Sequence, residues 1–222
     1  NPTLVVVDIM SVSELAHAGG ATVLVDNVFA TPVFSDAIAQ GADVVIYSTT
    51  KHVDGQGRAL GGVILGTQDF IRKTVEPYMK HTGAAMSPFT AWVMLKGLET
   101  MELRVRAQAG SALQLAEALH GHPALARVIY PGHSCHAQHD LVAQQMGGAG
   151  GTVLSLDLAG GHEAAFNTAV IWWRISCKPW KKHNNAYPGY AALQRQFPDL
   201  NVIHVAATHV IVSIIGNVPS GD

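Results

Sequence analysis

The chain has 222 residues, of which 48% are hydrophobic and 14% charged, and its formal net charge is −2. This composition excludes an intrinsically disordered chain, and the length allows one large or two small domains with a substantial core. The near-neutral charge gives no general attraction to nucleic acids or acidic membranes, and no run of about 18 apolar residues predicts a membrane-spanning helix.

The first third of the sequence alternates short apolar runs with segments of helical spacing. Four apolar runs predict strands, at residues 4–7, 22–25, 44–47 and 62–66. Helices are expected over residues 11–17 and from about 35 to 40. Strands that are apolar throughout and separated by helical crossovers are typical of a parallel sheet covered on both faces. The predicted fold class is therefore α/β, with a mostly parallel sheet.

The middle of the chain is predicted to be helical. Ser87 and Pro88 form a typical helix start, and an amphipathic pattern continues from there to about residue 120. Gly97 and Gly110 each weaken this long helix by about 1 kcal/mol, so kinks are expected there. A second, smaller α+β unit is expected from residue 123, with strands at 127–130 and 152–158 and a helix beginning near residue 163. We therefore predict one domain over residues 1–122 and another over 123–222.

The last 55 residues differ in character from the rest. Three of the four tryptophans cluster with three lysines over residues 172–182, and an apolar stretch over 201–215 predicts one or two strands. Aromatic and basic residues together are found in single-strand nucleic-acid sites. Because the net charge is −2 and no basic stripe accompanies the cluster, a packing role is favoured and no nucleic-acid partner is expected.

Polar residues follow two of the predicted strands at their carboxyl ends, where open parallel sheets bind ligands. Asp26 ends one strand, and Ser48, Thr50 and Lys51 end the next. A lysine there can form a Schiff base with an aldehyde cofactor, an aspartate can hold a pyridinium nitrogen protonated, and hydroxyls can bind phosphate. Together these residues indicate a pyridoxal phosphate site. Taken alone, each is more often a solvated strand end, a turn or a helix cap.

The sequence around these residues resembles the family of Cys/Met-metabolism pyridoxal-phosphate enzymes, within which it is most similar to the O-succinylhomoserine sulfhydrylases. The resemblance covers residues 1 to about 167. The segments that carry it are residues 25–32, 41–43, 47–52, 51–62, 81–83, 87–89, 95–100, 130–133 and 138–140. It implies an aspartate-aminotransferase-like fold (fold type I), with residues 1–122 in the large domain that binds the cofactor.

The resemblance also implies roles for individual residues. Lys51 would bind pyridoxal 5′-phosphate covalently and move protons on the substrate, and Asp26 would pair with the ring nitrogen. Ser48 and Thr50 would bind the phosphate, and Asn1 would contact the phenolic oxygen of the ring. The implied reaction replaces the succinyl group of O-succinylhomoserine with sulfide, which yields homocysteine for methionine biosynthesis. A cytoplasmic homotetramer is implied for the whole protein.

Two alternatives to this function remain open. A cystathionine γ-synthase, or a methionine or cystathionine γ-lyase, would share Lys51 and Asp26. A non-catalytic module that binds the cofactor or a partner would keep the same residues without turnover. The family's N-terminal phosphate loop and stacking aromatic have no counterpart here, and residues 168–222 do not match it, so no residue is assigned to the substrate carboxylate. We therefore expect the chain to be part of a longer protein and to have little activity alone.

Histidine and cysteine residues are concentrated at one further place. His133, Cys135, His136 and His139 lie within seven residues, and imidazole and thiolate groups at such spacing can bind zinc. A closed zinc site more often uses regularly spaced pairs, so a surface loop is the favoured interpretation and no metal site is predicted. The two cysteines cannot form a disulfide scaffold, which favours a reducing, cytoplasmic compartment.

Overall fold

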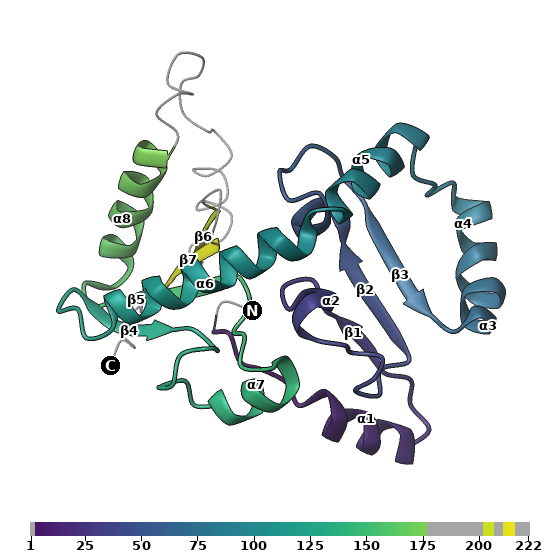
Figure 1. Ribbon diagram of the computed structural model, residues 1–222, viewed down its shortest axis with the longest axis horizontal. Coiled ribbons are helices and arrows are strands. Elements are labelled where there is room, and N and C mark those ends of the chain that lie inside the picture. Colours follow the sequence, from purple (N-terminus) through teal and green to yellow (C-terminus); the bar gives the residue numbers. More distant parts are fainter. Residues whose placement is uncertain (1–2, 177–201, 207–210, 216–222) are drawn as a thin grey trace.

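The computed structural model describes residues 3–176, 202–206 and 211–215, which form two sheets and the helices around them (Figure 1). The elements in chain order are α1 (Ile9–Ala18), β1 (Leu24–Asp26), α2 (Thr31–Phe34), β2 (Val44–Ser48), η1 (Thr49–Val53), β3 (Gly62–Gly66), α3 (Gln68–Phe70), η2 (Ile71–Val75), α4 (Glu76–Thr82), α5 (Pro88–Leu98), α6 (Met101–Leu119), β4 (Leu125–Ile129), α7 (His139–Met146), β5 (Val153–Leu158), α8 (Gly161–Ser176), β6 (Val202–Ala206) and β7 (Ile211–Ile215). No helix among the described residues is long and apolar enough to cross a membrane.

The first sheet has three strands in the order β1-β2-β3, and it confirms strands in three of the four predicted runs. β1 and β2 are parallel, as predicted, but β3 runs antiparallel to β2. The reason is the closed loop between them. The Thr49 amide donates to the Gly61 carbonyl, and the Gly61 amide donates to the Thr50 hydroxyl. These bonds hold the two ends of the loop side by side, so β3 runs back alongside β2 in the opposite direction. Ser48 and Gly62 are therefore direct partners.

The apolar run at residues 4–7 is not a strand, contrary to the prediction. Two glutamine side chains from the region of α7 form hydrogen bonds with its backbone. The Val6 amide donates to Gln138 Oε1, whose side-chain amide donates back to the Val6 carbonyl, and Gln145 does the same for the Ile9 amide and the Val7 carbonyl. A strand needs a neighbouring strand, and these side chains occupy that position among the described residues.

Two helix predictions also need correction. Residues 35–40 form a turn, and the helix lies earlier, at α2, where Pro32 stands in the first turn. The long helix predicted over 88–120 is two helices, α5 and α6, which are separated at residues 99–100. The break lies just after Gly97, where a kink was expected. No break occurs at Gly110, the other expected kink, because α6 continues through it.

The second sheet has the order β4-β5-β7-β6 and confirms strands at the predicted places. β5 is antiparallel to β4 and parallel to β7, and the stretch 201–215 supplies two antiparallel strands, β6 and β7. α8 begins two residues before the predicted helix start. The tryptophan and lysine cluster at 172–182 lies outside the residues whose side chains the structure describes.

Helix α6 runs across the molecule from one sheet to the other and contributes to two of the three hydrophobic cores among the described residues (Figure 1). Its N-terminal half packs in the core beside the first sheet, which includes Phe34, Val53, Met94, Met101, Val105, Ala109, Val142 and Met146. Its C-terminal half packs in the core beside the second sheet, which includes Ala112, Ala116, Tyr130, Leu154, Leu156, Leu158 and Ala165. The domain boundary at residue 122 stays a prediction, and it falls just after this shared helix.

Candidate functional site

The carboxyl ends of β1 and β2 lie side by side at one edge of the first sheet. Asp26, the last residue of β1, is in register with Ile46 on β2. The Asn27 amide donates to the Ile46 carbonyl at 3.1 Å, which continues the pairing beyond the end of β1. The polar residues that follow both strands therefore project from the same edge, as the sequence predicts.

Lys51 lies in η1, a π-helical turn that begins directly after β2. Its side chain is exposed, and its Nζ atom is 5.7 Å from the centre of the Phe29 ring. Phe29 follows Asp26 by three residues, so this contact joins the ends of the two strands. A cation over an aromatic ring at an exposed site is stabilised by about 0.5–1 kcal/mol. Lys51 makes no ion pair with the described residues, which leaves its amine accessible for chemistry.

Asp26 is exposed, and its Oδ1 atom accepts a hydrogen bond of 3.1 Å from the Val28 amide. This local bond holds the start of the turn that leads to Phe29. It occupies one carboxylate oxygen, and a carboxylate has further lone pairs for another donor. The geometry is compatible with both interpretations of Asp26, the structural turn and the cofactor contact.

The hydroxyl groups of the Lys51 turn differ in their surroundings. Thr50 Oγ1 accepts from the Gly61 amide at 2.9 Å, whereas the Ser48 hydroxyl does not cap the helical turn. Thr49 Oγ1 is buried without a hydrogen-bond partner among the described residues. A side chain at Gly61 would place its first carbon 2.6 Å from Thr49 Oγ1, so this glycine keeps the space beside the hydroxyl open. Thr49 was not among the site residues predicted from the sequence.

A cavity of about 410 Å³ lies next to the end of β1. Asp26, Phe29 and Thr152 are among its lining residues, whereas Lys51 is not. Phe29 connects the cavity with Lys51, because it lines the cavity and its ring lies below Lys51 Nζ. Asn1, the remaining predicted site residue, lies outside the described residues.

His52 was not predicted as a functional residue, although it directly follows Lys51. It is buried, its Nε2 atom is 3.0 Å from Thr152 Oγ1, and its ring makes an edge contact with Phe29 at 6.2 Å. Thr152 directly precedes β5, so this hydrogen bond connects the Lys51 turn to the second sheet. Burial, and to a lesser extent the positive charges of Arg104 and Lys51, lower the pKa of His52 from 6.5 to about 4. The imidazole is therefore neutral at neutral pH.

The pKa of His52 predicts an acid-sensitive contribution to stability. Between pH 6.5 and pH 4 the unfolded chain binds a proton at His52 that the folded chain does not, so the free energy of unfolding falls as the pH is lowered. From pH 7.5 to pH 5 we expect the natural chain to lose about 2 kcal/mol more than a His52→Gln variant, which cannot titrate there. Urea unfolding at the two pH values measures this difference. Equal losses of unfolding free energy in both proteins would contradict the lowered pKa of His52.

The loop after Lys51 is held by two arginines. The buried Asp54 carboxylate accepts from the Arg58 amide and pairs with Arg58 Nε at 2.8 Å. Burial raises the pKa of Asp54, but these contacts with Arg58 outweigh it, and the net pKa is lowered. Arg104 donates to the carbonyl oxygens of Val53 and Gly97, which ties the end of the Lys51 turn to α5 and α6. The turn is thus fixed from both sides.

Comparison with known proteins gives a consistent result. Residues 1–173 match the model of the family described as Cys/Met metabolism PLP-dependent enzyme. The chain is 54% identical over 158 residues to an O-succinylhomoserine sulfhydrylase of Mycobacterium tuberculosis, a match that covers 71% of the chain and 39% of that relative. It is 46% identical over 166 residues to an O-succinylhomoserine sulfhydrylase of Pseudomonas aeruginosa, which covers 75% and 41%.

A cystathionine gamma-lyase from Micromonospora echinospora has a similar structure, with a TM-score of 0.70 at 40% identity, over 73% of this chain and 43% of that one. Less similar curated relatives, at 38–39% identity, are named cystathionine gamma-lyase and cystathionine gamma-synthase. The chain spans about two fifths of the length of the sulfhydrylases that it matches.

Proposed function

The chain belongs to the Cys/Met metabolism PLP-dependent enzyme family, and we propose that its protein catalyses γ-replacement on O-succinylhomoserine with sulfide, releasing homocysteine and succinate. The fold is that of the fold type I pyridoxal-phosphate enzymes, and pyridoxal phosphate is the cofactor. The names of the relatives at 54% and 46% identity support sulfide as the nucleophile. The single structural observation that carries the proposal is the Lys51 turn at the end of β2, beside the end of β1 that bears Asp26.

The donor set at this edge fits pyridoxal phosphate. Lys51 offers an accessible amine, Asp26 a carboxylate, and Thr49 a buried hydroxyl without a partner among the described residues. Gly61 leaves room beside that hydroxyl, which a side chain would fill. Ser48 and Thr50 lie within the same turn, so we propose that these hydroxyls hold the phosphate, Asp26 the ring nitrogen and Lys51 the aldehyde carbon. Asn1 remains a proposed contact of the phenolic oxygen.

When bound, the cofactor supplies an electron-withdrawing ring that takes up negative charge from the substrate carbons. The residues of the chain then have separate tasks. Lys51 takes and returns protons at the substrate carbons, for which its amine must be neutral when it acts as a base. The Phe29 ring beneath Lys51 Nζ restricts where that amine can move. Asp26 keeps a proton on the ring nitrogen, and His52, held by Thr152, fixes the backbone of the turn.

Cystathionine γ-synthesis is the second candidate, because relatives at lower identity carry that name. It uses the same lysine and aspartate and differs in the nucleophile, cysteine in place of sulfide. The whole protein's substrates, its cytoplasmic location and its assembly as a homotetramer are likewise proposals, since the chain spans about two fifths of its relatives. A cofactor-binding module without turnover would form an adduct at Lys51 and release no product.

A chimeric enzyme tests the proposed reaction. The 158 matched residues of the M. tuberculosis relative would be replaced by those of this chain, so that every other part of the enzyme is supplied by the relative. We expect kcat/KM for homocysteine formation from O-succinylhomoserine and sulfide to lie within about tenfold of that of the parent enzyme. A tenfold decrease corresponds to about 1.4 kcal/mol less stabilisation of the transition state. A higher kcat/KM with cysteine than with sulfide would favour the synthase. A chimera that binds pyridoxal phosphate but releases no product would favour the non-catalytic module.

A further inference from the structure

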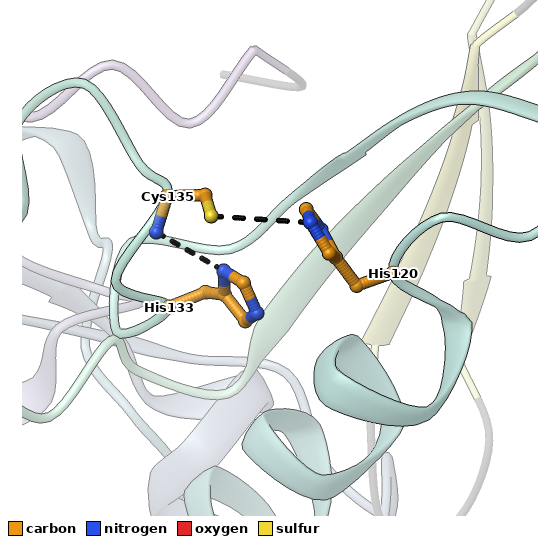
Figure 2. A group of neighbouring side chains, drawn as sticks. All are labelled: His120, His133 and Cys135. Atoms are coloured by element: carbon orange, nitrogen blue, oxygen red, sulfur yellow. Dashed lines mark hydrogen bonds between the residues drawn. The ribbon is translucent and has the colours of Figure 1, made fainter.

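Three potential metal ligands meet on the side of the molecule that carries β4 (Figure 2). His120 follows the last residue of α6, and His133 and Cys135 lie in the turns between β4 and α7. One ligand atom from each of the three residues lies within 4.8 Å of the others. Cys135 Sγ is 3.9 Å from His120 Nε2, and the two imidazole rings stack with their centres 4.9 Å apart.

The distances between these ligand atoms are close to those around a bound transition-metal ion. Tetrahedral zinc with Zn–S near 2.3 Å and Zn–N near 2.0–2.1 Å separates sulfur and nitrogen ligands by about 3.6 Å and two nitrogens by about 3.4 Å. The Cys135 Sγ–His120 Nε2 distance of 3.9 Å exceeds the first value by about 0.3 Å, and the upper bound of 4.8 Å exceeds the second by about 1.4 Å. His120 and Cys135 are exposed and His133 is half-buried, so small side-chain rotations suffice to bring the ligand atoms together.

We propose that His120, His133 and Cys135 form a binding site for a zinc-class transition-metal ion, with water as the fourth ligand. A thiolate and two imidazoles suit zinc and its neighbours, whereas magnesium and calcium prefer oxygen ligands. A cavity of about 550 Å³ adjoins the group, and His120 and Cys135 line it, which leaves space for the water. The residues around this cavity include neither Lys51 nor Asp26, so the site is separate from the proposed cofactor site.

The backbone places two of the ligands. The Cys135 amide donates to His133 Nδ1 at 3.2 Å, which holds the turn in a form that puts both side chains on one side (Figure 2). Coordination through Nδ1 replaces this bond, and coordination through Nε2 places the ring proton on Nδ1, so either mode gives up the bond from the Cys135 amide. A bound ion would join the end of α6 to the turns before α7, and it would stabilise the folded chain in proportion to its concentration.

The structure changes the ligand set that the spacing suggested. His133 and Cys135 belong to the group, whereas His136 and His139 do not, and His120 joins it from 13 residues earlier. The expectation of a surface loop rested on the spacing within this segment and on the family resemblance. Only the path of the chain through β4 brings the end of α6 back to this loop.

Cobalt provides a spectroscopic test. The reduced, metal-free 222-residue chain would be titrated with Co²⁺ and then with Zn²⁺ in competition, without pyridoxal phosphate. We expect one equivalent of Co²⁺ to give a thiolate-to-cobalt charge-transfer band, which Zn²⁺ removes. Cys135→Ser should lose this band, and His120→Ala should weaken Zn²⁺ affinity at least about tenfold, since each removes one of three ligands. Lower pH should weaken binding in the natural chain because protons compete for the ligands.

Two variants are matched controls. Cys177→Ser removes the other cysteine, and His122→Ala removes an exposed histidine two residues from His120 that is not part of the group. Both should keep the band and the affinity of the natural chain, and circular dichroism reports whether each variant is folded. Absence of the band in the natural chain, its loss in Cys177→Ser, or equal Zn²⁺ affinity in His120→Ala and His122→Ala would overturn the proposal.

Discussion

Lys51→Ala is expected to abolish the specific attachment of pyridoxal phosphate to the chain. In the natural chain, incubation with the cofactor followed by borohydride reduction should leave a stable adduct on Lys51, located by digestion and mass spectrometry. Lys51 Nζ is exposed over the Phe29 ring, and Lys51 lies in the same turn as Thr49 and Thr50, whose hydroxyls suit a phosphate. In the chimeric enzyme the same substitution should lower turnover by about 10²–10⁴-fold or more, the range typical of a lost acid–base group.

Two further variants separate chemistry from charge. Lys51→Arg keeps the cation over Phe29 but cannot form the adduct, so it should fail as completely as the alanine variant. Lys96→Ala removes a surface lysine that pairs with Glu99, and it should leave the adduct unchanged. Adducts scattered over many lysines in the natural chain, with Lys51 no more labelled than Lys96, would show that the proposed site does not assemble.

Gly97→Ala is expected to destabilise the chain by about 1–3 kcal/mol, the usual cost of overpacking. A methyl group at Gly97 would overlap the Val53 carbonyl oxygen and lie 2.9 Å from its carbonyl carbon and 3.1 Å from Asp54 Cα. Alanine favours a helix over glycine by about 1 kcal/mol, which only partly offsets the clash. Because Val53 ends the Lys51 turn, the substitution should also reduce the adduct on Lys51.

Gly110→Ala is the matched control, because it makes the same change in the neighbouring helix α6. Apart from the backbone of its own helix and its chain neighbours, no described atom lies within 4 Å of a Cβ built at Gly110, so only the helix propensity changes. We expect the free energy of unfolding to stay the same or rise by up to about 1 kcal/mol. Urea unfolding of both variants measures the contrast. If Gly97→Ala proved as stable as Gly110→Ala, the close packing of α5 on the Lys51 turn would be wrong.

The two glycines show where local pattern is informative and where it is not. Both weaken a helix equally by propensity, yet the chain breaks after Gly97 and continues through Gly110. Propensity depends on the residue alone, whereas the break depends on what packs against it. The same limit applies to residues 4–7, whose apolar run is typical of a strand. Gln138 and Gln145, more than 130 residues away, take its backbone hydrogen bonds.

Local sequence was sufficient for most of the elements and for placing Lys51 and Asp26 at the ends of neighbouring strands. The α/β class, six of the seven predicted strand runs and the position of Lys51 and Asp26 at strand ends follow from hydrophobic runs and from polar residues at their ends. These features depend on neighbours along the chain. The antiparallel direction of β3, the Lys51–Phe29 contact, the His52–Thr152 bond and the approach of His120 to Cys135 were decided only by the tertiary structure. Each joins side chains or strands whose distance depends on the path of the whole chain, which no local pattern encodes.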